Sequence, residues 1–362
     1  MVAVTDLRWR VSTRAGMVRA MPAIDRAELE VLRQLLCRLG DAIRDRVVAA
    51  RASSTTEELA GVAEVTAADT IYRIDKISEE VIVAWFGATW PAALPVEVVM
   101  EGLEGHGPLT FPAGTPVDRT RWKVIIDPID GTRCIMYDKR AAWALAAVAP
   151  QRGAVTHLGD IVAAAMTELP TTKQWRADQV SAVRGGGRDG VLAEGVHVIT
   201  GARARLALQP SRALDLHHGF ASFVKFFPDG KEFTAQLEEM LWHELGEAGQ
   251  VVNPLIFDDQ YPSTGGQIYE LVSGRDRFIA DLRPLVFPRV GVPASLTCHP
   301  YDICTAMILA EAGGVVEAPD GSPLRVPLDT TSPVAWVGYA SEALAALVRP
   351  RLQRLLRERG ML

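Results

Sequence analysis

A short apolar run that leads directly into two closely spaced aspartates constrains this chain more than any other feature of its sequence. The β-branched residues 124–126 predict a buried strand, and Pro128 is expected to stop it. An Asp-Gly step then predicts a tight turn, which would present Asp127 and Asp130 beside the Thr132 hydroxyl. Such an oxygen-rich, anionic corner suits a hard cation such as Mg²⁺, although aspartate is equally typical of a strand-ending turn.

The composition sets broad limits on the kind of protein. With 362 residues, 48% of them hydrophobic, the chain is long enough for a large core and for one or two domains. Its net charge of -6 argues against general nucleic-acid binding, because proteins that bind nucleic acids usually carry a basic face. The first 20 residues contain no long apolar run, so they predict neither a secretion signal nor a membrane span.

The cysteines bear on the cellular compartment. They are Cys37, Cys134, Cys298 and Cys304. None of them forms a Cys-x-x-Cys pair, which argues against a zinc site and against a disulfide framework. A cytoplasmic location is therefore the simplest expectation.

Hydrophobic spacing predicts the elements of the first half. Apolar residues at helical intervals indicate helices over 25–52 and 69–86, and the Gly- and Pro-rich residues 102–117 indicate a loop. Extended runs predict strands, antiparallel after the aspartate turn, at 96–100, 142–149, 161–168 and 174–183. The glycines at 185–187 predict a turn rather than a phosphate cradle, since no helical pattern follows directly.

The second half alternates strands and helices. Strands are predicted at 196–199, 277–281, 315–316 and 334–337, and helices at 233–247, 265–273, 301–312 and 341–357. This alternation indicates an α+β protein built in layers. A change of composition near 185–196 predicts an N-terminal domain over 1–190, carrying most of the candidate site, and a C-terminal domain over 191–362.

Further acidic residues stand at informative places. Asp75 and Glu79 lie four apart on one predicted helix, and Glu101 ends a predicted strand, with Glu104 in the loop beyond it. Asp302 begins a predicted helix that ends in Glu-Ala-Gly-Gly. Taken singly, each has a structural explanation: a solvated helix face, a surface acid or a helix cap.

In their order along the chain, these features resemble the inositol monophosphatase superfamily. That superfamily comprises lithium-sensitive, magnesium-dependent phosphatases and includes fructose-1,6-bisphosphatases and bisphosphate nucleotidases. The matching motifs are Asp-x-x-x-Glu at 75–79, Glu101, Asp-Pro-Ile-Asp-Gly-Thr at 127–132, and Tyr-Asp at 301–302 with Glu-Ala-Gly-Gly at 311–314. The resemblance implies a layered αβαβα sandwich of the sugar-phosphatase type, a homodimer, and hydrolysis of a small phosphorylated metabolite.

The resemblance also implies a set of metal ligands. Asp127 matches the residue that bridges two Mg²⁺ ions in the family. Glu101 and the carbonyl of Ile129 match ligands of the first ion, and the resemblance implies that Glu101 also takes part in catalysis. Asp130 and Asp302 match ligands of the second, and two or three ions are implied in all.

Other matches concern the attacking water and the substrate. Thr132 matches the residue that orients the water, and Asp75 matches the acid that assists it. Gly131, Thr132 and Arg133 match the backbone that binds the phosphate at a helix start. Asp281 lies near the place of an acid that contacts a substrate hydroxyl in the family.

Several departures leave alternatives open. Glu104 competes with Glu101 as the ligand, and Arg133-Cys134 stands where the family has another pattern. The segment 203–263 adds length of unassigned role. An inositol-1-phosphate-like polyol or sugar phosphate is the leading substrate class. A nucleotide 3′-phosphatase, a sugar bisphosphatase or a catalytically weak metabolite-binding member are the alternatives.

Overall fold

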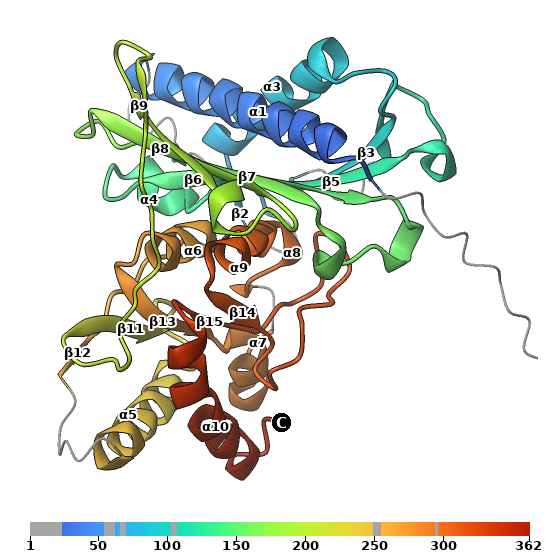
Figure 1. Ribbon diagram of the computed structural model, residues 1–362. Helices are drawn as coiled ribbons and strands as arrows, with labels where there is room; N and C mark the ends of the chain where they lie inside the picture. The colour runs from blue at the N-terminus through green and yellow to red at the C-terminus, as the bar shows by residue number, and fades with distance from the viewer. Residues whose placement is uncertain (1–23, 54–61, 66–69, 103–106, 249–254, 294–295) are drawn as a thin grey trace, which may run out of the picture.

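A computed structural model describes residues 24–53, 62–65, 70–102, 107–248, 255–293 and 296–362. The chain forms five layers, helix–sheet–helix–sheet–helix, stacked from one end of the molecule to the other (Figure 1). This arrangement confirms the α+β, αβαβα architecture expected from the sequence. Among the helices of the described part, none has the length and apolar character needed to cross a membrane.

The first sheet has eight strands, in the order β10-β9-β8-β7-β6-β5-β3-β4. Their bounds are β3 Val96–Met100, β4 Leu109–Phe111, β5 Trp122–Asp130, β6 Ala142–Pro150, β7 Ala163–Leu169, β8 Arg176–Val183, β9 Leu192–His197 and β10 Arg203–Arg205. Neighbouring strands are antiparallel except β3 and β5, which run parallel. A separate two-stranded ribbon pairs β1 (Val62–Val65) with β2 (Thr70–Tyr72).

The second sheet has five strands, in the order β12-β11-β13-β15-β14. Their bounds are β11 Gly219–Phe223, β12 Ile256–Phe257, β13 Asp276–Asp281, β14 Val315–Glu317 and β15 Trp336–Tyr339. β11 runs parallel to both of its neighbours, whereas β15 is antiparallel to β13 and β14. The carboxyl ends of β11 and β13 therefore open at the same edge of the sheet.

Helices occupy three layers. The layer outside the first sheet holds α1 (Arg26–Ser53) and α3 (Arg73–Thr89). The layer between the sheets holds α6 (Thr264–Val272), α8 (Pro300–Ile303) and α9 (Ala306–Ala312). The layer outside the second sheet holds α5 (Lys231–Ala248) and α10 (Glu342–Glu358). Two short helices, α4 (Thr132–Met136) and α7 (Arg283–Val286), follow β5 and β13.

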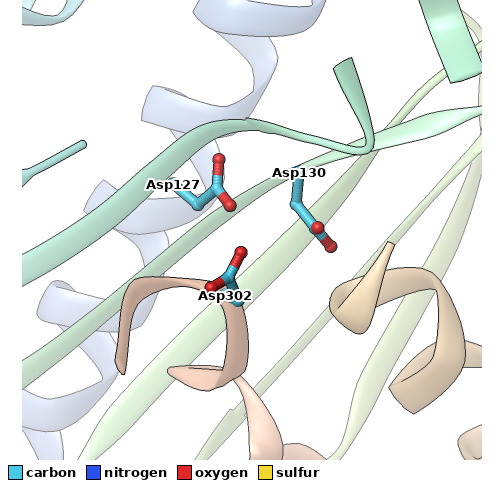
Figure 2. Close-up of side chains that lie close together, drawn as sticks. All are labelled: Asp127, Asp130 and Asp302. Carbon is cyan, nitrogen blue, oxygen red and sulfur yellow. The ribbon is translucent and has the colours of Figure 1, made fainter. Parts of the chain in front are cut away.

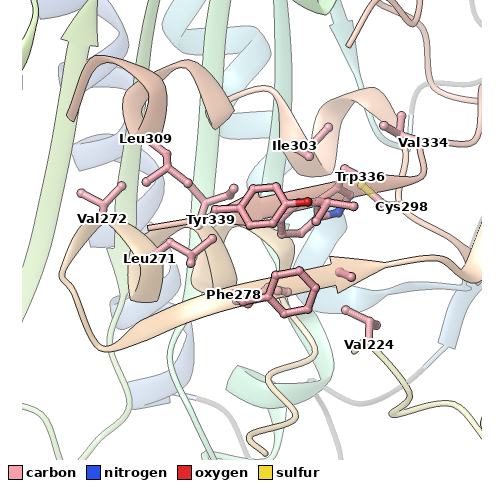
Figure 3. Packing of buried hydrophobic residues seen from close by; sticks show 14 of the residues in the cluster. Val224, Leu271, Val272, Phe278, Cys298, Ile303, Leu309, Val334, Trp336 and Tyr339 are labelled. Carbon is pink, nitrogen blue, oxygen red and sulfur yellow. The ribbon is translucent and has the colours of Figure 1, made fainter. Parts of the chain in front are cut away.

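The two faces of the first sheet bury separate cores. On one face, the leucine stripe of α1 packs with Val124 and Ile126 of β5. On the other, Ile125 joins a larger cluster that continues through the middle helices to the second sheet. Figure 3 shows part of that cluster, where Phe278 of β13 and Tyr339 of β15 pack with their rings 5.5 Å apart. Because side chains alternate along a strand, every odd position of β5 up to residue 127 faces the middle layer.

Some predicted boundaries are wrong. The helix predicted over 69–86 begins at Arg73, and residues 70–72 form β2. The predicted loop over 102–117 contains the edge strand β4, which pairs with β3. The strand predicted at 196–199 is β9, which begins at residue 192 and pairs with β8. The helix predicted over 301–312 is divided at residues 304–305 into α8 and α9.

The change from one sheet to the other lies between β10 and β11, at residues 206–218. The division of domains at residue 190 remains a prediction, and the first sheet extends past it. The glycine turn at 185–187 has a clear partner: the backbone N–H groups of Gly185 and Gly187 donate to the carboxylate of Glu311, at 2.8 and 2.6 Å. These amides hold the end of α9 against the first sheet.

Candidate active site

A one-residue bulge in β5 places the two motif aspartates on one face of the first sheet. Asp127 pairs with Leu145 and Asp130 with Trp143, so three steps along β5 match two steps along β6. Without the bulge, residues three apart would point to opposite faces. Pro128 has no N–H to donate. It lies inside the bulge, where the regular pattern of hydrogen bonds between the strands is already interrupted. The expectation that Pro128 ends the strand is therefore wrong.

Glu101 reaches the same place from the neighbouring strand. β3 and β5 are parallel, and Met100 pairs with Ile126. The residues that follow this pair are Glu101, just past the end of β3, and Asp127 of β5. Both line one cavity, so the parallel pairing brings these two acids to the same edge.

Asp302 completes the acidic group from the middle layer. It lies in α8, which packs against β5. Oxygen atoms of Asp127, Asp130 and Asp302 all lie within 4.8 Å of one another. Figure 2 shows the three carboxylates converging from β5 and α8. We call these three residues and Glu101 the acidic end of the cavity.

The N-terminus of α6 holds the carboxylate of Asp130. Its Oδ2 accepts hydrogen bonds from the Ser263 hydroxyl at 2.7 Å and from the Gly265 N–H at 2.5 Å. Its Oδ1 accepts one from the Thr264 N–H at 3.2 Å. A Cβ on Gly265 would lie 2.5 Å from Leu145 and 2.9 Å from the carboxylate, so only glycine lets this backbone come so close. An oxygen has two lone pairs, so Oδ1 keeps one for a cation.

Backbone amides orient the other two aspartates. The Ile129 N–H donates to Asp127 Oδ1 at 3.0 Å, a local Asx-type bond. The His299 N–H donates to Asp302 Oδ2 at 2.5 Å, at the start of α8. Hydrogen bonds of this kind fix the direction of potential ligand groups before any ion binds.

Burial and mutual repulsion disturb the titration of these acids. Burial raises the pKa of Asp127 well above its usual value, and the nearby charges of Glu101, Asp130 and Asp302 raise it further. Burial also raises the pKa of Asp130, to about 6, against the lowering effect of its bonds from Ser263, Gly265 and Thr264. These carboxylates therefore repel one another at neutral pH unless a positive charge lies between them.

The residues present fit a divalent cation. The donors are carboxylate oxygens, which hard cations such as Mg²⁺ prefer, and they are held in position by the protein backbone. A cation would compensate the repulsion that helps to raise the pKa of Asp127. The acidic end therefore has both the ligands and the electrostatic need for a metal.

The residues predicted to bind phosphate line the same cavity, whose volume is about 270 Å³. Gly131 has φ of 90° and leads into α4, and a Cβ there would lie 3.0 Å from Ser263. Glycine is therefore required for both its left-handed backbone and its closeness to α6. The Thr132 hydroxyl donates to the Ile129 carbonyl at 2.7 Å, and Arg133 also lines the cavity.

Not every predicted residue can be assigned to the cavity. The side chain of Asp75 and the whole of Glu104 lie outside the described residues. Of the two competing ligands Glu101 and Glu104, only Glu101 is described, and it lines the cavity. Asp281 is fully buried and is not among the residues that line the cavity; both its oxygens accept from Arg283. Arg283, rather than Asp281, is among the residues that line the cavity.

Several lining residues were not predicted from the sequence. Ser263 caps α6, and a Ser-Thr-Gly-Gly sequence before a helical pattern is the signal that could have found it. Phe226, Phe227 and Arg283 follow the second-sheet strands β11 and β13. No local motif marks them, because their place depends on the parallel pairing of those strands.

Comparisons with known proteins agree with this fold. No protein-family model matches the sequence, and no curated protein matches it significantly. Solved structures do match. SuhB of Bartonella henselae shares 15% identity, with 92% of this chain and 99% of that chain covered and a TM-score of 0.56. The inositol monophosphatase of Anabaena shares 15% identity over 91% and 97%, with a TM-score of 0.55.

A sugar phosphatase matches as well. The fructose-1,6-bisphosphatase of Leishmania major shares 14% identity, with 92% of this chain and 96% of that chain covered and a TM-score of 0.61. The resemblance predicted from the motifs is thus confirmed at the level of the fold. The chain has the fold shared by inositol monophosphatase and fructose-1,6-bisphosphatase structures.

Proposed function

We propose that this protein is a Mg²⁺-dependent phosphoric monoester hydrolase of the inositol monophosphatase superfamily. The observation that carries the proposal is the convergence of Asp127, Asp130 and Asp302, whose oxygen atoms lie within 4.8 Å of one another in one cavity. The residues expected to bind phosphate, at 131–133, line the same cavity. The shared fold with inositol monophosphatase and fructose-1,6-bisphosphatase structures supports it.

In this proposal the acidic end would hold the ions. Asp127 would be shared between two of them, with Glu101 and the Ile129 carbonyl on one and Asp130 and Asp302 on the other. When bound, Mg²⁺ supplies positive charge against the anionic ester and lowers the pKa of a nearby water.

The chain's own groups position the reactants. Gly131, Thr132 and Arg133 would receive the phosphate through their backbone amides. Thr132 would orient the attacking water, as the resemblance implies, and its hydroxyl donates to the Ile129 carbonyl at 2.7 Å. Asp75 would assist that water, as the resemblance implies. The in-line attack breaks the P–O bond, and the proton of the water ends on the released alcohol or on solvent.

The substrate class is a small phosphorylated metabolite. An inositol-1-phosphate-like polyol or sugar phosphate is the first candidate from the resemblance. A nucleotide 3′-phosphatase or a sugar bisphosphatase is the alternative, and a catalytically weak metabolite-binding member is a third. We also propose a homodimer, a cytoplasmic location and sensitivity to lithium, which the same resemblance implies.

Phosphate release tests the proposal. Purified protein is incubated with a panel of phosphomonoesters, with Mg²⁺ or with excess EDTA. We expect release from at least one ester with Mg²⁺ and none with EDTA. Tight Mg²⁺ binding without turnover of any ester would favour the metabolite-binding alternative. Lithium should inhibit the Mg²⁺-dependent rate; indifference to lithium would indicate different metal geometry at Asp302.

A further inference from the structure

The end of the cavity supplied by the second sheet is aromatic. Phe226 and Phe227 lie in the loop between β11 and α5, and Arg283 begins α7 after β13. Because β11 and β13 are parallel neighbours, the loops that follow them lie at the same edge of the sheet. The two rings are 5.0 Å apart, and both line the cavity. We call Phe226, Phe227 and Arg283 the aromatic wall.

The single cation of the aromatic wall is already engaged by the protein. Arg283 donates from Nε and Nη2 to the two oxygens of Asp281, at 2.9 and 2.6 Å, and from Nη1 to the Leu296 carbonyl at 3.0 Å. Its guanidinium carbon lies 4.9 and 5.4 Å from the ring centroids of Phe226 and Phe227. It therefore supports the rings by a cation–π contact and pairs with Asp281, the acid that the resemblance places near a substrate hydroxyl.

Other polar side chains of the cavity lining are also paired with the protein. The Ser263 hydroxyl donates to Asp130 and accepts from the Gly266 N–H. The Tyr301 hydroxyl lies 3.3 Å from His299 Nδ1. At this part of the cavity, the hydroxyl groups of a polyol would have to compete for Arg283, Ser263 and Tyr301 with the bonds that these residues already make within the protein, which disfavours polyol binding. The face of a flat aromatic ring needs no hydrogen-bond partner.

We infer that the aromatic wall selects esters whose alcohol carries a planar aromatic ring, so that the substrate is a nucleoside monophosphate rather than a polyol phosphate. The inference rests on the proposed function. The acidic end would bind the phosphate, and the base would stack on Phe227, with Phe226 tilted by 52° beside it. Stacking of a base on an aromatic side chain changes affinity by about 5- to 150-fold, which is enough to decide between substrates.

The test compares Mg²⁺-dependent kcat/KM for three monoesters: adenosine 3′-monophosphate, inositol 1-phosphate and glycerol 2-phosphate. We expect the adenosine ester to exceed each of the others by at least about 10-fold. Phe227→Ala should lower kcat/KM for the adenosine ester by about 5- to 150-fold, chiefly through KM, and for glycerol 2-phosphate much less. Phe227→Trp should retain the preference, because it keeps an aromatic face.

A second pair of phenylalanines provides the matched control. Phe257 of β12 lies 5.9 Å, ring to ring, from Phe220 of β11 and is 48% exposed. This pair belongs to the same sheet but is not among the residues lining the cavity. Phe257→Ala should leave all three kcat/KM values unchanged. Thermal unfolding of each variant shows whether the fold is retained.

The outcomes separate this inference from the proposed function. A preference for inositol 1-phosphate, or an equal loss on all three esters in Phe227→Ala, overturns the inference and leaves the phosphatase intact. A preference for fructose 1,6-bisphosphate over the adenosine ester overturns it as well. If no ester is hydrolysed, the proposed function fails, and calorimetric binding with Mg²⁺ decides the inference. Adenosine 3′-monophosphate must then bind more tightly than inositol 1-phosphate, and less tightly in Phe227→Ala.

Discussion

The acidic end and the aromatic wall of the cavity are built in different ways. At the acidic end, Asp127 and Asp130 come from one bulged strand, and backbone amides fix their carboxylates. The aromatic wall consists of side chains from the segments that follow β11 and β13, where Arg283 contacts both rings and is held by its buried ion pair with Asp281. In the function proposed above, attack on phosphate and choice of alcohol would be carried by these two different parts of the cavity. The two can therefore be changed separately.

The largest effect is expected at Asp127, the proposed shared ligand. Asp127→Asn removes one charge from the acidic end and should lower phosphate release from every ester by about 10³-fold or more, because metal charge contributes several kcal/mol to the transition state. The measurement is kcat/KM on at least two esters with different alcohols.

The buried Asp276 of β13 supplies the control for that variant. Burial and nearby acids raise its pKa to about 7, and it is not among the residues lining the cavity. Asp276→Asn should keep normal activity. If Asp127→Asn affected one ester and spared another, the separation of attack from choice of alcohol would be wrong.

A smaller loss is expected where the protein orients Asp130. Ser263→Ala removes both the hydroxyl bond to Asp130 and the N-cap of α6. It should reduce Mg²⁺ affinity or activity by about 10- to 100-fold, as for partners of metal ligands generally. It should also lower the free energy of unfolding by about 1 kcal/mol.

Ser341 separates the two effects of that change. It caps α10 through the Leu344 N–H at 3.2 Å and is not among the cavity residues. Ser341→Ala should lose similar stability, measured by urea unfolding, at full activity. Equal activity in both serine variants would show that the bond to Asp130 has no functional role.

The raised pKa values predict how Mg²⁺ and pH act together on stability. Asp130 titrates near 6 when folded and about 3.9 when unfolded, so the folded state binds more protons between these values. The free energy of unfolding of the metal-free protein should therefore fall as pH rises from about 4 to 7, with about 3 kcal/mol from this group.

Urea unfolding with and without Mg²⁺ measures this coupling. Mg²⁺ should stabilise the protein more at pH 7.5 than at pH 4.5, and Asp130→Asn should reduce the difference. A stabilisation by Mg²⁺ that does not depend on pH would contradict an ion bound between these carboxylates.

The smallest effect is expected away from both ends of the cavity. Glu311→Gln weakens the bonds from Gly185 and Gly187 that hold α9 to the first sheet. It should lower the free energy of unfolding by about 1 kcal/mol and leave kcat/KM within about twofold. Glu358→Gln, at an exposed ion pair with Arg354, is the control and should change neither. A large loss of activity in Glu311→Gln would show that α9 transmits strain to Asp302.

The sequence predicts the acidic end better than the aromatic wall, for physical reasons. The leucines of α1 and the β-branched residues of β5 predict a helix and a strand, because the local spacing of apolar residues alone determines which side chains are buried. The bulge at Pro128 is less visible, since it appears only when β5 is paired with β6. The resemblance places Asp281 near a substrate hydroxyl, but Asp281 is buried in an ion pair with Arg283. This ion pair can be recognised only in the folded structure. Phe226 and Phe227 depend on strand order, which no local pattern contains.

The central claim is that acids from both parts of the chain hold the ion that drives phosphate release. The most direct test is the Mg²⁺ dependence of phosphate release by the wild type and by Asp302→Asn. We expect a saturable rise in rate for the wild type, with at least about tenfold more Mg²⁺ needed, or no rate at all, for the variant. Release that persists in excess EDTA, or a Mg²⁺ curve unchanged by Asp302→Asn, would contradict it.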